Sequence, residues 1–228
     1  MLKKLTDEQQ EKLLVTAVEE FGSKGPERAA VSEIARRSGI SVGVIYKYYK
    51  NKEALFDACL TRSTDMLKAM IAEAVDREDT LAEACEKLIR TCISFARRNP
   101  HYIQMYHAIT HEPGEKAAYY AETIEKYTAM IYTGIIRKAQ EEGTVRRDID
   151  PAYLALFFDN LLMMLHFDAG CRYYNERRKF YLGAAEDDEK MTEQLVFFMK
   201  GAFGMTDSVS SGSNPVTEST GSAQEGEV

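Results

Sequence analysis

Residues 31–55 read VSEIARRSGISVGVIYKYYKNKEAL, and this run constrains the fold more than any other part of the chain. It predicts a short helix, a turn at Gly39 where glycine supplies a left-handed backbone, and a second short helix that Ser41 can cap. Ile34 and Ala35 should face inward, and Ala35 is small where the second helix must cross closely. The pattern is typical of a helix-turn-helix.

Positive charge is concentrated in the same segment, although the whole chain is acidic. The formal net charge of −7 by itself argues against a nucleic-acid partner, because phosphate binding depends on Lys and Arg. From Arg28 to Lys52, however, there are six basic residues against one acid, Glu33. Beyond residue 60, acids outnumber bases 27 to 19. Only one end of the molecule is therefore expected to approach DNA.

The rest of the sequence predicts an all-α protein. With 228 residues, 45% of them apolar, it can bury a sizeable core, and it shows no strand or hairpin signal. Capping boxes at Thr6–Gln9 and Thr80–Glu83 open two helices, and Asp150 followed by Pro151 opens another. We expect about nine helices, over residues 7 to 22–26, 31–38, 42–49, 52 to at least 71, 81–98, 101–111, 115–142, 151 to about 174, and about 186–203.

The sequence shows no pattern of a membrane span or a signal peptide. The N-terminal MLKKLTDEQQEKLL turns polar after five residues, and the longest apolar run, 152–167, is too short for a bilayer and carries Asp159 and Asn160. We therefore expect a cytoplasmic protein without a membrane partner. Its cysteines lack CxxC spacing and should be buried reduced thiols, with a redox role left open for the pair seven residues apart, Cys85 and Cys92.

The second helix of the motif carries side chains suited to DNA. Val44 and Ile45 are successive apolar positions, so one can pack inward while the other meets a thymine methyl group. Tyr46, Lys47 and Tyr48 follow with two hydroxyls and an ammonium at the edge of the groove. In the first turn of the next helix, Lys52 can meet a phosphate together with the backbone N–H groups there.

The run VSEIARRSGISVGVIYKYYKNKEALF resembles the DNA-binding signature of the TetR family of bacterial transcriptional regulators, strongly over residues 7–67. An Ile-Ala pair, a Gly-Ile-Ser turn, a late tyrosine and a Lys-x-Lys-Glu-x-Leu start to the fourth helix carry the resemblance. It implies an N-terminal DNA-binding domain (1–50), a helical ligand-binding and dimerisation domain (51–204), and a homodimeric repressor released from a palindromic operator by a small molecule. Residues 205–228, rich in Ser, Gly and Thr, are expected to form a disordered tail.

The resemblance also assigns DNA contacts residue by residue. Tyr46, Tyr48 and Lys52 correspond to phosphate-contacting positions. The positions that reach bases or backbone in the family correspond to Ser32, Val42, Gly43, Val44 and Lys47. Because Val42 cannot form a bidentate bond to a base, Lys47 and DNA shape are expected to carry much of the specificity. The candidate DNA-binding residues are Ser32, Ser41, Val42, Gly43, Val44, Tyr46, Lys47, Tyr48 and Lys52.

Aromatic and methionine side chains on the predicted fifth to seventh helices suggest where an effector binds, since those helices enclose the inducer pocket in the family. Such a surface suits a flat or lipophilic ligand, a cationic one among the options. The candidate ligand-binding residues are Phe95, Tyr102, Met105, Tyr106, Tyr127 and Met130. The identity of the effector is not encoded in this pattern.

The predicted helix that starts at residue 151 is apolar almost all round, so it must be covered on two sides, and we expect a partner subunit to cover one of them. The last helix is the natural second member of a four-helix interface with a second copy of the chain. The candidate interface residues are Phe157, Leu161, Met164, Leu195, Phe198 and Met199.

Two other classes of function were weighed. His107 and His111 have the four-residue spacing of a metal pair, but no third ligand has a defined spacing and HExxH is absent, so we expect no metal, no cofactor and no enzyme. A dimeric ligand-binding or adaptor protein that has lost operator binding stays open, because the recognition helix is so apolar.

Overall fold

The computed structural model describes residues 4–76, 79–111, 115–184 and 187–205, and within these ranges the chain is helical, with no strand. The predicted tail from Thr206 onward lies outside the described residues. Ten helices form the described fold: α1 Asp7–Arg28, α2 Val31–Ser38, α3 Val42–Tyr48, α4 Lys52–Ala74, α5 Leu81–Arg98, α6 Pro100–Ile109, α7 Glu115–Glu141, α8 Pro151–Gly170, α9 Arg172–Leu182 and α10 Asp188–Phe203.

Local capping sets the start of several helices, as the sequence predicts. Both bonds of the capping box form at α1, where the Thr6 hydroxyl accepts from the Gln9 backbone N–H and the Gln9 side chain accepts in return. The predicted stop of this helix is only partly right. Gly25 has a left-handed φ of 77° that kinks α1, yet a last turn after Pro26 extends it to Arg28.

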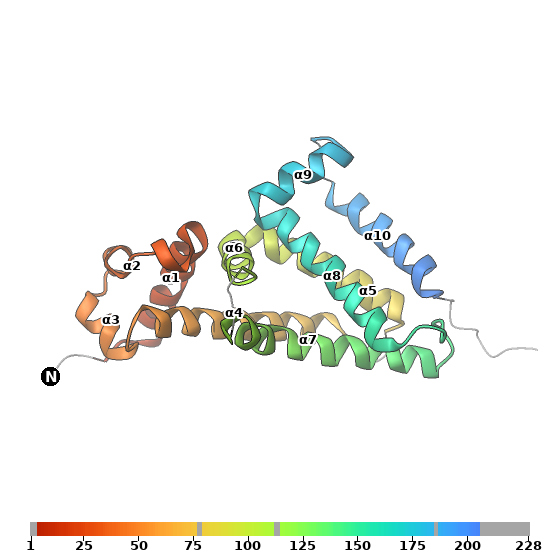
Figure 1. The fold of residues 1–228 in the computed structure, drawn as a ribbon, viewed down its shortest axis with the longest axis horizontal. Coiled ribbons are helices and arrows are strands. Elements are labelled where there is room, and N and C mark those ends of the chain that lie inside the picture. Colours follow the sequence, from red (N-terminus) through yellow and green to blue (C-terminus); the bar gives the residue numbers. More distant parts are fainter. Residues whose placement is uncertain (1–3, 77–78, 112–114, 185–186, 206–228) are drawn as a thin grey trace, which may run out of the picture.

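Helix α4 joins two hydrophobic cores. Its first half, with Leu55 and Phe56, packs into the core that holds α1, α2 and α3 together, whereas Ile71 lies in a second core between α5, α7, α8 and α10. In Figure 1, α1–α3 lie at one end of the molecule, and α4 runs from them alongside α7 into the larger helical body. One long helix therefore connects the two parts.

Helix α6 packs between α1 and α8. On each side, a glycine of the neighbouring helix lets α6 approach closely. A Cβ added to Gly22 of α1 would lie 2.4 Å from the carbonyl oxygen of His101 in α6. A Cβ added to Gly170 of α8 would lie 2.5 Å from the Cβ of Ile103, and Gln104 donates a hydrogen bond of 3.1 Å to the Gly170 carbonyl. Because no larger residue fits at either glycine, α6 is held tightly on both sides.

The prediction of a single helix from 151 to about 174 is wrong, and the described ranges hold ten helices where about nine were expected. Helix α8 ends at Gly170, Cys171 is extended (φ −119°, ψ 125°), and a separate helix α9 follows. The sequence has no proline at this break. The break lies at Gly170, where α8 packs closely against α6. On α9, the aromatic side chains of Tyr173, Phe180 and Tyr181 are largely exposed.

Helix α8 also corrects the reading of the apolar run at 152–167. That run belongs to a 20-residue helix, the one helix in the described ranges that length and composition alone would allow to cross a membrane. The core helix of a soluble protein meets the same test. Here α8 packs against α5, α6 and α7, and Leu154, Phe158 and Leu162 lie in the second core.

Candidate functional site

The helix-turn-helix has the predicted geometry. Ile34 of α2 is fully buried, Ala35 is nearly so, and Gly39 caps α2 with a φ of 76° in the left-handed region. The Ser41 hydroxyl accepts from the backbone N–H of Val44 and so caps α3. Each of these sequence predictions is confirmed.

Helix α3 turns one face inward and another toward solvent. Ile45 is buried, and Val44 is half-buried against the same core, so Ile45 is the inward member of the apolar pair. Val42, Tyr46 and Lys47 are exposed together with Gly43. On α2, Ser32 is exposed as well. These solvent-facing positions are the part of α3 and α2 that can reach a DNA groove.

Two of the residues predicted to contact phosphate form hydrogen bonds within the protein. The Tyr48 hydroxyl accepts a hydrogen bond of 2.7 Å from the backbone N–H of Leu5. The Lys52 ammonium donates to the carbonyl oxygens of Glu27 (2.8 Å) and Ala29 (3.3 Å), which caps the C-terminal end of α1. Both side chains therefore brace the N-terminal helices.

A buried carboxylate holds the start of α2, whose N-cap residue has no capping side chain. Ala30 at the N-cap offers no side-chain bond, but its own N–H donates to the Glu20 carboxylate at 3.2 Å. Glu20 is almost fully buried and pairs with Lys24 at 2.7 Å and with Arg37 at 3.8 Å. This role of Glu20 was not predicted from the sequence, where its only signal is an acid on the apolar side of the first helix.

Ion pairs hold two of the six basic residues between Arg28 and Lys52. Arg36 pairs with Glu33, and Arg37 pairs with carboxylates of α1. Within the described part of the chain, no ion pair involves Lys47 or Lys50. Lys47 is therefore placed to meet DNA without first breaking an internal pair.

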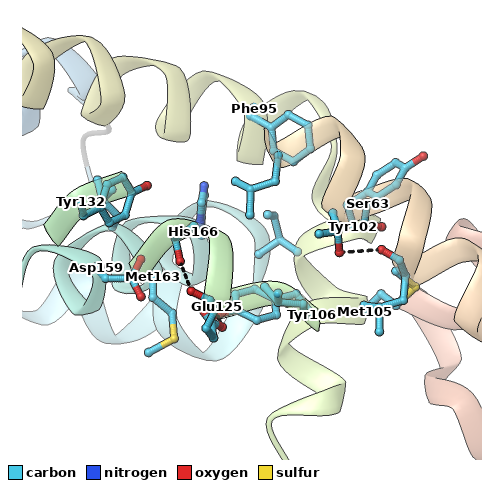
Figure 2. A pocket seen from close by; sticks show the side chains of 17 residues that line it. Ser63, Phe95, Tyr102, Met105, Tyr106, Glu125, Tyr132, Asp159, Met163 and His166 are labelled. Carbon is cyan, nitrogen blue, oxygen red and sulfur yellow. Dashed lines mark hydrogen bonds between the residues drawn. The ribbon is translucent and has the colours of Figure 1, made fainter. Parts of the chain in front are cut away.

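A cavity of about 80 Å³ lies where α4, α5, α6, α7 and α8 meet. Phe95, Tyr102, Met105 and Tyr106 line it, as predicted (Figure 2). Tyr127 and Met130 do not line this cavity, because α7 turns a different face to it. The residues that line the cavity are Leu60, Ser63, Thr64, Leu67, Phe95, Tyr102, Ile103, Met105, Tyr106, Ile124, Glu125, Thr128, Tyr132, Asp159, Leu162, Met163 and His166.

Two carboxyl groups and an imidazole enter this largely apolar cavity. Burial raises the pKa of Glu125, whose carboxylate accepts a hydrogen bond of 2.6 Å from the Tyr106 hydroxyl. Burial, and then the charge of Glu125, raise the pKa of Asp159 to about 7. Burial lowers the pKa of His166 to about 4, and its Nε2 atom is buried without a hydrogen-bond partner. At neutral pH the imidazole is therefore uncharged.

None of these three polar groups was predicted to lie at the site. In the sequence, Asp159 argues against a membrane span, although an acid inside an apolar helix is also the signature of a buried functional carboxylate. Glu125 and His166 give no such signal, because the first lies on a polar-looking stretch of α7 and the second among apolar neighbours. Their convergence depends on how α7 and α8 pack.

The predicted dimer face is partly exposed, as an interface requires. Phe157 of α8 is 49% exposed and Phe198 of α10 is 59% exposed, while Leu161, Met164 and Leu195 are half-buried. Met199 is fully buried in the core of its own subunit, so its assignment to the interface is wrong. The reason is that α10 packs on α5 through the Met199 side. Three further apolar residues on α8 and α10 are exposed, namely Tyr153, Leu156 and Phe197.

The remaining sequence candidates are structural. All four cysteines are buried, and burial raises the pKa of Cys85 and of Cys92 to about 12, which disfavours the reactive thiolate. The rings of His107 and His111 contact each other at a tilt of 56°, with their centroids 4.8 Å apart. The described residues contain no group of three His, Cys, Asp or Glu placed to hold a metal ion.

Comparison with known proteins gives a family for the motif. Residues 13–59 match the family model described as "Bacterial regulatory proteins, tetR family". The chain is 31% identical over 101 residues to the nucleoid occlusion factor SlmA of Actinobacillus pleuropneumoniae, covering 44% of this chain and 50% of that protein. The chain thus spans about half the length of the SlmA proteins that it matches.

Two further similarities extend over most of the chain. It is 24% identical over 217 residues to the uncharacterized HTH-type transcriptional regulator YvdT of Bacillus subtilis, covering 88% of this chain and 98% of that protein. The structure of the transcriptional regulator FadR from Bacillus subtilis in complex with stearoyl-CoA superposes with a TM-score of 0.69 at 16% identity, covering 83% of this chain and 97% of that chain. The all-helical fold is therefore the fold of such regulators.

Proposed function

We propose that this chain, whose residues 13–59 match the family model of the tetR bacterial regulatory proteins, is a homodimeric repressor that a small aromatic or lipophilic effector releases from a palindromic operator. Proteins of this family are transcriptional regulators and not enzymes. One observation carries the proposal: α4 and α6 line the cavity and also connect it to the helix-turn-helix, whose recognition helix α3 is exposed.

The connection supports control of DNA binding by the cavity. Leu60 and Thr64 of α4 line the cavity. Earlier in the same helix, Leu55 and Phe56 pack in one core with α1. Tyr102 and Met105 of α6 line it as well, and α6 presses on α1 at Gly22. A ligand that fits better when α4 and α6 shift would therefore favour a different placement of the helix-turn-helix.

The exposed apolar face of α8 and α10 supports the homodimer. Its large aromatic side chains, among them Phe157 and Phe198, lie on two helices that both pack on α5, and they would be covered by the same face of a second copy. A two-fold dimer places two recognition helices on one side of DNA and so requires a palindromic operator. We further propose the cytoplasm as the site of action, where the DNA and the effector meet.

The test is a gel shift with the intergenic DNA upstream of the gene for this protein. We expect a specific complex that dissociates when a fraction of cell metabolites is added. Absence of any specific complex would refute the repressor and favour a ligand-binding or adaptor protein of the same fold.

A second measurement tests the recognition helix. Lys47→Ala should relax specificity by about 1–3 kcal/mol at one base position, because Lys47 is the exposed basic group of α3. The variant and the wild type are titrated against operator and against a scrambled duplex. An equal loss of affinity on both duplexes would contradict a role in base reading.

A further inference from the structure

We propose that the cavity binds an organic cation, a protonated amine or quaternary ammonium group on a small apolar body, with the carboxylates of Glu125 and Asp159 as its counter-charges. This inference rests on the proposed function, since it names the effector class of the same cavity. It is distinct from a merely lipophilic ligand because it assigns a charge to one end of the effector.

Two carboxyl groups reach the cavity from two helices. Glu125 comes from α7 and Asp159 from α8, and Figure 2 shows both on the same side of the cavity. Among the described residues that line it there is no lysine and no arginine. Ionising either carboxyl group there is costly, because burial removes water without supplying a cation. A cationic ligand would supply that missing charge, whereas an anionic group would raise the cost further.

Aromatic rings surround the same space. Tyr106 lines the cavity while its hydroxyl donates to Glu125, so its orientation is fixed beside the carboxylate. Phe95 and Tyr132 add two more ring-bearing side chains to the wall. The faces of such rings attract a cation, most strongly where water is excluded. Carboxylates and rings together favour a positive group over a neutral one.

His166 is an independent sign that a polar ligand belongs in the cavity. Its side chain lies in the cavity wall, is nine-tenths buried, and leaves Nε2 without a partner in the protein. A buried nitrogen without a hydrogen bond costs stability, so a ligand that bonds to it gains affinity. The imidazole is neutral near pH 7, because burial lowers its pKa to about 4, and it therefore does not balance the carboxylates itself.

The size of the cavity limits the apolar body. About 80 Å³ is room for roughly half a dozen water-sized groups, at about 10–15 Å³ each, which suits a phenyl ring with a short arm. The structure similar to this chain that holds stearoyl-CoA has a ligand with a long chain and anionic phosphates. The charges and size of the present cavity favour a different chemical class.

The test compares three probes with one phenylethyl body and different heads: 2-phenylethylamine (cation), 2-phenylethanol (neutral) and 3-phenylpropionate (anion). Binding to the full-length protein is measured by calorimetric titration at pH 7.5. We expect the amine to bind about tenfold or more tightly than the alcohol, and the carboxylate to bind most weakly. Equal or tighter binding of the carboxylate, or no binding of the amine at millimolar concentration, would overturn the proposal.

Variants locate the effect. In the double variant Asp159→Asn, Glu125→Gln, the preference for the amine over the alcohol should fall to about two- to threefold, the part that the rings supply, while the alcohol still binds. Glu122→Gln removes an exposed carboxylate from the same helix as Glu125 and should keep the preference. A double variant that retains the tenfold preference would refute the role of the carboxylates. The probe series on the wild type decides the charge preference even if the double variant fails to fold.

The two proposals fail separately. If the amine binds the cavity but never dissociates the protein from its operator, the cation site stands and ligand-controlled repression falls. If a neutral or anionic metabolite releases the operator and the amine does not bind, the regulator stands and the cation site falls.

Discussion

Replacing Asp159 by asparagine should make the protein more stable at neutral and basic pH. Its carboxyl group has a pKa of about 7 in the folded chain against an ordinary value of 3.8, because burial and Glu125 disfavour its charge. The native state therefore holds this proton about a thousand times more tightly than the unfolded chain, equivalent to about 4 kcal/mol. Since Asp159 is half-buried and water screens part of its charge, we expect a measurable effect of about 2 kcal/mol.

The sign follows from proton uptake. Between about pH 4 and pH 7 the folded chain binds more protons at this site than the unfolded chain, so the free energy of unfolding falls as pH rises through that window. The amide that replaces the carboxyl group does not titrate, so Asp159→Asn should match the wild type near pH 4 and exceed it at pH 8.

Denaturant unfolding, followed by circular dichroism at fixed protein concentration from pH 5 to pH 8, measures this difference. Thermal unfolding should show the variant about 4–8 °C higher at pH 8. Glu122→Gln, which also removes one carboxylate but at an exposed ion pair with Lys126, should follow the pH profile of the wild type. Parallel stability profiles for Asp159→Asn and the wild type would refute the reasoning.

Three other predictions test the fold and its interfaces. Phe157→Asp should weaken the dimer at least about thirtyfold in sedimentation, whereas Phe180→Asp on α9, away from the α8 and α10 face, should leave it unchanged; a monomeric wild type would contradict this. Gly22→Ala should destabilise the protein by about 1–3 kcal/mol in denaturant unfolding, because its Cβ would strike the α6 backbone, whereas Gly134→Ala has free space and should be neutral or stabilising. Lys52→Ala should weaken binding to all DNA sequences alike and lower stability by about 1 kcal/mol, since two carbonyls of α1 lose their donor; unchanged thermal stability would exclude the bracing role.

Much of the helical framework could be predicted because its signals are local. A capping box, a glycine that must adopt a left-handed φ and a proline at the first helical position act within one turn of the chain. Thr6, Gly39, Ser41 and Asp150 therefore mark their helix ends in the structure as they do in the sequence. The inward faces of short amphipathic helices follow from periodicity, as the burial of Ile34 shows.

The candidate sites were predicted less evenly. The exposed face of α3 can be predicted from a compact motif. The bracing hydrogen bonds cannot, because Tyr48 bonds to a residue 43 positions away in the chain, and Lys52 bonds to residues 25 and 23 positions away. Periodicity indicates that α7 has an apolar side without stating which neighbour that side meets. Met130 was therefore assigned to a cavity from which it points away, and Met199 to an interface that it cannot reach.

The sequence alone determined the helix-turn-helix, the positions of most helix ends and the concentration of positive charge at one end, because each depends on residues that are neighbours along the chain. Only the tertiary structure decided that α8 stops at Gly170 and that α6 is clamped between two glycines. It alone brought Glu125, Asp159 and His166 around one cavity. Those groups come from different turns of two packed helices, and their altered proton affinities arise from the water that this packing removes.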